Sequence, residues 1–418
     1  MNTPPISWID SSSHWHWLEQ QSDALLAFYA ANAVDYENGG FWWIDGNGKP
    51  IAAQGKRLWI NARLTYAFAI GTLLGKPGYR KLLEHGIKYL ETGPLRDNTN
   101  GGWFWSIGPT DGTTDHSKQS YGHAFVLLAA ASAIIAGTDA RRLFDDALDT
   151  LNDRFWDHDA EMFVDTWNED FSELEPYRGQ NANMHLVEAL MTAAEVVDDP
   201  ALIDKAVKIA SRLIRQVTAN NDWRLPEHFA PDWTFDPDFN KEDPDNLFRP
   251  YGSTIGHWLE WSRLLIQLNA ASANEFPWMP EAAAHLFHWG IEDGWDETVS
   301  GFAFSTDWNG KVVNGDRYHW VIAESIGSAV ALYRTTRDPV YAAWYQQFWE
   351  HAESFLIDPI DRSWTHQLDA HNNAASDAWD GKPDLYHALQ ATLFARIPTS
   401  GSLITNLAAG HIDRTTHA

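Results

Sequence analysis

The sequence of 418 residues contains no cysteine. Disulfide bonds, a thiol nucleophile and a cysteine metal site are therefore excluded. The N-terminal segment has neither the charged region nor the apolar core of a secretion signal. No apolar run approaches the length of a membrane span, and the stretch at 125–137 has the length of a buried helix. We therefore expect a cytoplasmic protein without a membrane partner.

Basic residues are scarce. The chain has 30 Lys and Arg against 57 Asp and Glu, a formal net charge of −27. Proteins that bind nucleic acids need a basic surface to contact phosphates, so a nucleic-acid partner is not expected. The simplest interpretation of the charge is an acidic, well-solvated surface.

Several catalytic sequence patterns are also missing. There is no HExxH pattern of a zinc site, no GxSxG turn of a serine hydrolase, and no GxGxxG loop before a helix. We therefore expect neither a metal ion nor another cofactor.

The chain does contain a repeat, and it is rich in tryptophan, with 23 residues. Loops near six tryptophans, about 53 to 72 residues apart, each precede an apolar helix: Trp43, Trp103, Trp156, Trp223, Trp295 and Trp364. A basic or imidazole side chain opens each of these helices: Arg63, His123, His185, His257, His319 and His387. Such a period indicates helical units that bury their apolar faces against their neighbours.

Apolar residues recur at helical spacing in twelve segments: 25–33, 62–74, 79–90, 122–136, 140–154, 184–197, 202–217, 255–270, 280–290, 320–335, 340–355 and 385–396. Six helix pairs predict an all-α (α/α)6 barrel, with short β-hairpin loops at one mouth. We expect one domain over residues 1–418, with 398–418 as a tail. In a closed ring the six helix openings share one mouth.

A mouth that combines imidazoles, an arginine and tryptophans is typical of a sugar site with acid–base chemistry. His257 and His387 are the candidate proton-transfer pair. Glu260 lies three residues after His257, on the same helix face, where a carboxylate can orient the ring. The alternative for both histidines is a structural role at a helix start, which we also expect for His123 because it has no acidic neighbour.

Other residues are candidates for binding the substrate. Asn181 and His185 share one helix opening, and Arg63 offers a planar fork of donors for an oxygen-rich ligand. Trp320 and Glu324 lie one turn apart on another helix. Arg249 and Trp379 lie in loops that precede the helices of His257 and His387.

The segments INARLTYAFA, YGHAFVLLAA, NANMHLVEA, RPYGSTIGHWLEW, RYHWVIAE and DLYHALQA resemble the N-acylglucosamine 2-epimerase superfamily over about residues 10–397. The similarity is greatest to its aldose–ketose isomerases. The resemblance implies an (α/α)6 barrel and a metal-independent interconversion of D-mannose and D-fructose, with D-lyxose as a second substrate. It also implies that His257 and His387 are the acid–base pair, and that Arg63, Asn181, His185, Glu260 and Glu324 contact the sugar.

Other functions remain open at this point. The superfamily also contains sugar 2-epimerases, of cellobiose or N-acylglucosamine type, and sulfoquinovose isomerases, in which Arg249 or Lys382 would have to bind the sulfonate. An inverting glycoside hydrolase would need two acids from a set that forms no paired motif: Asp97, Asp111, Glu227 and Asp316. A sugar-binding module without activity would explain the tryptophans but not the histidines. The sequence does not decide between a monomer and a homo-oligomer.

Overall fold

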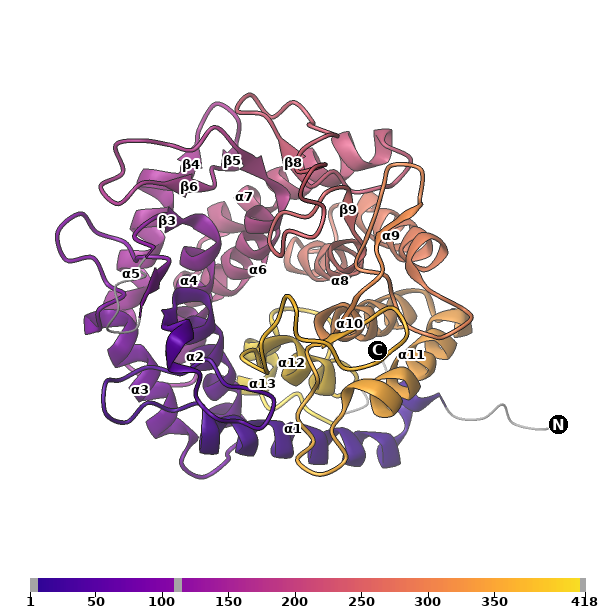
Figure 1. Cartoon of the computed structure of the whole chain (residues 1–418), viewed down its shortest axis with the longest axis horizontal. Coiled ribbons are helices and arrows are strands. Elements are labelled where there is room, and N and C mark those ends of the chain that lie inside the picture. Colours follow the sequence, from indigo (N-terminus) through magenta and orange to yellow (C-terminus); the bar gives the residue numbers. More distant parts are fainter. Residues whose placement is uncertain (1–6, 109–114, 414–418) are drawn as a thin grey trace.

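The computed structural model describes residues 7–108 and 115–413. Within these ranges, two concentric rings of helices surround one axis (Figure 1). The inner ring consists of α2 (Leu58–Leu73), α4 (Ser120–Ile135), α6 (Gln180–Val197), α8 (Ile255–Ala271), α10 (His319–Thr336) and α12 (Tyr386–Phe394). The outer ring consists of α1 (Ser12–Asn32), α3 (Tyr79–Thr92), α5 (Arg141–Thr150), α7 (Pro200–Ala210), α9 (Trp278–Gly294) and α11 (Pro339–His351). All twelve predicted segments are thus helical, and α12 closes the ring by packing against α1 and α2.

The two rings differ in burial, as their sequences predict. The inner helix α2 buries every side chain from Leu58 to Gly71, whereas the outer helix α3 buries one face, which includes Leu83, Ile87 and Leu90. Small residues allow close approach inside the ring. A β-carbon on Gly256 would lie 2.3 Å from the Trp320 ring, so only glycine lets this indole pack against α8.

Short strands connect the helices at one end of the ring. The strands β1 (Lys56–Arg57), β3 (Lys118–Gln119), β7 (Arg178–Gly179), β9 (Ser253–Thr254) and β12 (Arg317–Tyr318) each lead directly into an inner helix. Each pairs antiparallel with a strand of the next loop, in the same order: β2 (Ser106–Ile107), β6 (Thr166–Trp167), β8 (His228–Phe229), β10 (Ser305–Thr306) and β13 (Gln367–Leu368). The strand β11 (Val312–Asn314) pairs with the other edge of β10, and β4 (Trp156–Asp157) pairs with β5 (Met162–Phe163).

One backbone hydrogen bond recurs at the first residue of five inner helices and four residues before the sixth, α12. An N–H there donates to a carbonyl of another loop: Leu58 to Trp105, Ser120 to Asp165, Gln180 to Glu227, Ile255 to Phe304, His319 to His366 and Lys382 to Ile44, at 2.9–3.1 Å. These bonds replace side-chain N-caps and fix the rotation of each helix. They also give the six openings a common reference point.

Five residues after this N–H, the six side chains meet at the axis: Arg63, Phe125, His185, Glu260, Glu324 and His387. Several neighbours in this set contact each other, as Arg63 does Phe125, His185 does Glu260, and Glu324 does His387. The histidines of the sequence repeat are not equivalent by this measure. His123 comes three residues after the N–H, His257 two, and His319 is the donor residue itself.

The C-terminal segment adds a short helix, α13 (Leu403–Ala408), which packs against α2, α4 and α6. Its apolar side chains Leu403, Ile404 and Leu407 are buried. The described part of the predicted tail is therefore packed onto the ring, because these residues cover its inner helices.

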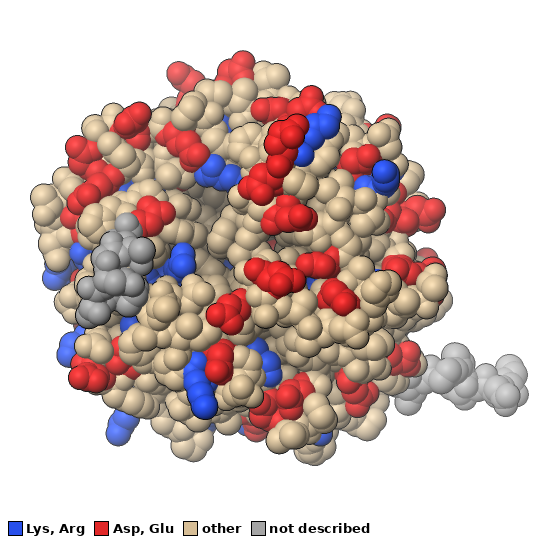
Figure 2. All heavy atoms as spheres, in the orientation of Figure 1, with Lys and Arg blue, Asp and Glu red and all other residues tan. Residues whose placement is uncertain are grey.

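The surface matches the acidic composition. Acidic side chains are spread over the face that carries the connecting loops and outnumber the basic ones there (Figure 2). Among the residues that the structure describes, no helix is both long and apolar enough to cross a bilayer.

Candidate active site

A narrow pocket of about 50 Å³ opens at the loop end of the axis. Eight predicted site residues line it: Arg63, Asn181, His185, His257, Glu260, Trp320, Trp379 and His387. A wider open cleft adjoins this pocket, and Tyr121, Asn181 and Phe248 line both. The structure thus brings together most of the residues that the sequence singled out.

His387 reaches the pocket from the second residue of α12 and is fixed by Glu324 of α10. Its Nδ1 lies 2.8 Å from Glu324 Oε1. A carboxylate only accepts hydrogen bonds, so Nδ1–H donates and Nε2 keeps a free lone pair. Burial, and next the charge of Arg63, hold the pKa of His387 well below its usual range. The ring is therefore neutral near pH 7, as a general base requires.

His257 is fixed in the same manner by a carboxylate that the sequence analysis did not assign to it. Its Nδ1 lies 2.9 and 3.0 Å from the two carboxylate oxygens of Glu227. Gln180 and the backbone N–H of Thr254 also donate to Glu227. Burial alone would raise the pKa of Glu227, but the charge of His257 and its hydrogen bond outweigh burial and lower it.

The predicted partnership of His257 with Glu260 is wrong. Glu260 is three residues further along α8, but its Oε1 lies 3.6 Å from His185 Nδ1 on α6. The cause is the rotation of α8, which turns position 260 to the axis and leaves His257 beside the loop that carries Glu227.

Trp320 lies between the two candidate catalytic rings. Its ring centroid is 5.3 Å from that of His257 and 5.7 Å from that of His387. Both imidazoles therefore border the part of the pocket that this indole lines. A flat apolar surface of this kind suits the face of a sugar.

Arg63 also lines the pocket, and its guanidinium is held by two hydrogen bonds. Its Nη1 donates to Asp384 Oδ2 at 2.6 Å, and its Nη2 donates to the Tyr121 hydroxyl at 2.9 Å. Burial alone would raise the pKa of Asp384, but Arg63 and then His387 outweigh it and lower the pKa. A fixed cation at this place can stabilise an oxyanion in the pocket.

Buried polar atoms of six pocket residues lack hydrogen-bond partners within the described ranges. They are Arg63 Nε, Asn181 Oδ1, His185 Nδ1, Thr254 Oγ1, Trp379 Nε1 and both carboxyl oxygens of Glu260. Buried polar atoms in proteins are nearly always paired, so unpaired ones that line a pocket are suited to a polar ligand.

Below the pocket, one guanidinium faces three glutamates. Arg263 donates to Glu324 Oε2 at 2.8 Å, and it lies 3.5 Å from Glu260 and 3.8 Å from Glu188. Burial, and next the charge of Glu324, raise the pKa of Glu260 well above its usual range. One cation does not balance three buried carboxylates, so Glu260 is the group that retains its proton.

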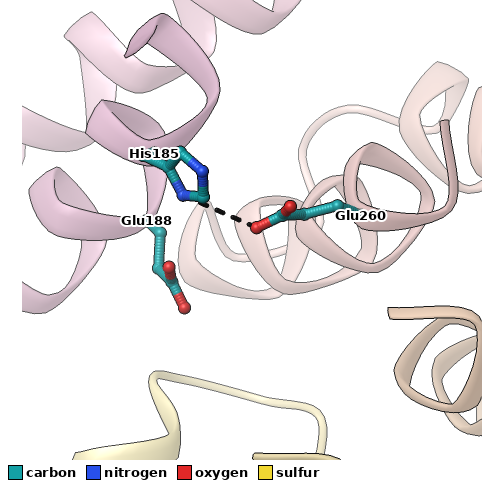
Figure 3. A group of neighbouring side chains, drawn as sticks. All are labelled: His185, Glu188 and Glu260. Atoms are coloured by element: carbon teal, nitrogen blue, oxygen red, sulfur yellow. Dashed lines mark ion pairs between the residues drawn. The ribbon is translucent and has the colours of Figure 1, made fainter. Parts of the chain in front are cut away.

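Two groups of side chains in this region have the chemistry of metal ligands. His185, Glu188 and Glu260 form one, with His185 and Glu188 on α6 and Glu260 on the neighbouring helix α8 (Figure 3). Glu260, Glu324 and His387 form the other. Arg263 lies within 4 Å of all three glutamates. A metal ion here would be repelled by this guanidinium, so the arrangement favours a proton over a metal.

Two predicted substrate contacts lie outside the pocket. Glu324 is fully buried behind His387, which it orients. Arg249 lines the adjoining cleft, where both its terminal nitrogens pair with Glu175 at 2.7 and 2.9 Å. Lys382, the other proposed sulfonate anchor, does not line the pocket. Its Nζ donates to Ser363 Oγ at 2.7 Å.

His123 and His319 have structural contacts. His123 accepts from the backbone N–H of Trp103 at 3.1 Å and donates to the carbonyl of Gln119 at 2.7 Å, so both ring nitrogens are used. His319 stacks on His366 with ring centroids 3.9 Å apart. The structural role expected for His123 agrees with these contacts.

The sequence analysis missed Asp384, Tyr121 and Arg263, and it named Glu227 only as a hydrolase candidate. Asp384 stands three residues before His387, and this short spacing could have identified it as a pocket residue. Glu227 stands 30 residues before His257, and its loop meets the opening of α8, where the N–H of Thr254 donates to the Glu227 carboxylate. Nothing in local spacing reveals such a contact.

Comparisons with known proteins agree with this geometry. Residues 39–391 match the family model described as N-acylglucosamine 2-epimerase (GlcNAc 2-epimerase). The chain is 40% identical to a D-mannose isomerase of Thermobifida fusca, over 96% of this chain and 98% of that protein. It is 39% identical to a D-mannose isomerase of Pseudomonas cannabina pv. alisalensis, over 96% and 97%.

A solved structure gives the same result for the fold. A crystal structure of D-mannose isomerase superposes with a TM-score of 0.84 at 31% identity, over 94% of this chain and 98% of that one. The predicted fold class is confirmed. The chain belongs to the N-acylglucosamine 2-epimerase family.

Proposed function

We propose that this chain is an aldose–ketose isomerase that interconverts D-mannose and D-fructose, with D-lyxose and D-xylulose as a second pair. One observation carries the proposal. In His257 and in His387, Nδ1 is hydrogen-bonded to a glutamate carboxylate, and both rings lie beside the Trp320 indole in one pocket. The names of the relatives in Thermobifida and Pseudomonas support the choice of D-mannose.

The reaction starts from the open-chain sugar. One histidine removes the proton on C2, and the C2–H electron pair forms a C1=C2 double bond while the carbonyl pair moves to O1. The resulting cis-enediolate lies near Arg63, whose guanidinium stabilises the negative charge. Return of the proton to C1, with the hydroxyl proton moved from O2 to O1, gives the ketose. In this scheme, side chains of the protein carry out each of these reaction steps.

A 2-epimerase shares the first step but returns the proton to the other face of C2. Products therefore separate the two activities. D-Mannose incubated with the protein in EDTA should give D-fructose, measured by chromatography. Formation of D-glucose without ketose, or of epilactose from lactose, would assign the chain to the epimerases.

The contacts of the cationic side chains favour a neutral sugar over a sulfonated one. A sulfonate needs a fixed cation, best supplied by an arginine fork. Arg249 is paired with Glu175, and Lys382 lies outside the pocket. We expect kcat/KM for D-mannose to exceed that for sulfoquinovose. A preference for sulfoquinovose of more than about tenfold would reverse this assignment.

The three described candidate acids of a glycoside hydrolase are each bonded to another side chain. Asp97 bonds to Lys118, and Glu227 bonds to His257. Asp316 accepts from Gln367, and Asp111 lies outside the described residues. Assays for release of reducing sugar from glycosides should therefore be negative.

A further inference from the structure

An aldose–ketose isomerase must move two protons, and the reaction given above assigns only the carbon-bound one to a histidine. The carbon-bound proton goes from C2 to C1, and the hydroxyl proton goes from O2 to O1. The second transfer needs a group that donates to one oxygen and accepts from its neighbour. A neutral carboxylic acid does both at once, through its two oxygens.

Glu260 is placed for this transfer. It occupies the axis position of α8, lines the pocket, and is 1% exposed. Both of its oxygens lack hydrogen-bond partners among the described residues, although they are buried. Its nearest polar neighbour in the pocket, His185, also has an unpaired Nδ1. The carboxyl group thus lines the pocket with hydrogen-bonding capacity that no described residue uses.

The surroundings explain why this carboxyl is an acid rather than a carboxylate. Glu324 takes the shortest contacts of Arg263 and also binds His387. Glu188 hydrogen-bonds to the Tyr386 hydroxyl and does not line the pocket. Glu260 accepts no hydrogen bond from a described residue, its contact with Arg263 is 3.5 Å long, and burial raises its pKa well above the usual range. We therefore expect Glu260 to be protonated.

We propose that Glu260 is the catalytic residue that carries the hydroxyl proton from O2 to O1 in the isomerisation. This inference rests on the proposed function. When the histidine has removed the C2 proton, one oxygen of Glu260 gives its proton to O1 of the enediolate. The other oxygen takes the proton from O2, and the O2 electron pair forms the C2=O2 bond as the C1=C2 pair takes a proton from the histidine. The histidine and Glu260 both return to their starting states.

The substitution Glu260→Gln tests this role, because glutamine keeps the shape but cannot transfer a proton. In D₂O, proton removal from C2 and its return still occur, so deuterium enters C2 of recovered D-mannose. Ketose formation is blocked. We expect the ratio of C2 exchange to D-fructose formed, measured by NMR, to rise at least about tenfold over wild type.

The control is Glu188→Gln, the same change in a glutamate that contacts the same guanidinium below the pocket. Its exchange ratio should stay at the wild-type value. An unchanged ratio in Glu260→Gln, or an equal rise in both variants, overturns the proposal. If Glu260→Gln does not fold, Glu260→Asp carries the test, because drawing the acid back by one methylene must also raise the ratio.

The wild-type protein separates the two levels of inference. If wild type forms no D-fructose from D-mannose, the proposed function fails. If it forms D-fructose and Glu260→Gln keeps the wild-type ratio, the function stands and only the role of Glu260 fails.

Discussion

His257 and His387 differ from His123 and His319 in what their ring nitrogens contact. In the first pair a carboxylate holds Nδ1 and the ring borders the pocket. In His123 backbone groups occupy both nitrogens, and His319 is stacked on another imidazole. All four belong to the same sequence repeat. Position in the repeat therefore brings a histidine to the loop end of the ring, and its partner decides what it does.

The largest expected effect comes from removing either imidazole of the first pair. His257→Ala and His387→Ala should each lower kcat by at least about 10²-fold, the usual contribution of a general acid or base. Both proteins should fold, because each ring borders the pocket rather than packing wholly in the core. Steady-state kinetics and circular dichroism check these outcomes. Near-normal turnover of either variant would remove that histidine from the mechanism.

The supporting carboxylates come next. Glu324→Gln replaces the acceptor of His387 Nδ1–H with an amide that can donate, so the ring can adopt the wrong tautomer. We expect kcat to fall by about tenfold or more, and the same from Glu227→Gln for His257. Kinetics measure the loss. If neither variant is slower, the carboxylate partners do not explain why His257 and His387 differ from His123 and His319.

A smaller effect concerns acid pH. This test takes His387 as the base, which must be neutral to act, and burial holds its pKa well below the usual value near 6.5. Its protonation, and the activity lost with it, should therefore occur only as pH falls below 6.5. The measurement is kcat/KM between about pH 5 and pH 8. A midpoint above pH 6.5 would contradict the neutral, buried base.

The smallest effect on activity is expected at His123. Asn61 and Asn183 stand at the same position of their helices and accept the equivalent backbone N–H, from Phe41 and Phe163, at 2.7 and 2.9 Å. An asparagine can thus replace this histidine. His123→Asn should keep kcat/KM and most of the stability.

The matched variant His123→Ala should keep kcat/KM but lower the free energy of unfolding by about 1–3 kcal/mol, because it leaves the N–H of Trp103 unpaired. Chemical denaturation compares the two variants. A loss of catalysis in His123→Asn would place this residue in the site after all.

The helices and the loop positions were predictable because apolar periodicity and turn residues are local signals. All twelve segments formed helices, and the histidines of the pocket lie at their openings. The rotation of each helix was not predictable, since it follows from backbone bonds between loops far apart in sequence, such as Lys382 to Ile44. For that reason Glu260 was assigned to the wrong histidine and the role of Glu227 was missed.

The central claim is that histidines move a proton between C2 and C1 of D-mannose. The most direct test is the reaction of the wild-type protein in D₂O, with the product analysed by NMR. An imidazole that faces an open pocket exchanges its proton with solvent, so the D-fructose formed should carry deuterium at C1. D-Fructose formed at the normal rate without any deuterium at C1 would mean that the hydrogen does not pass through a group that exchanges with solvent, and it would contradict the account.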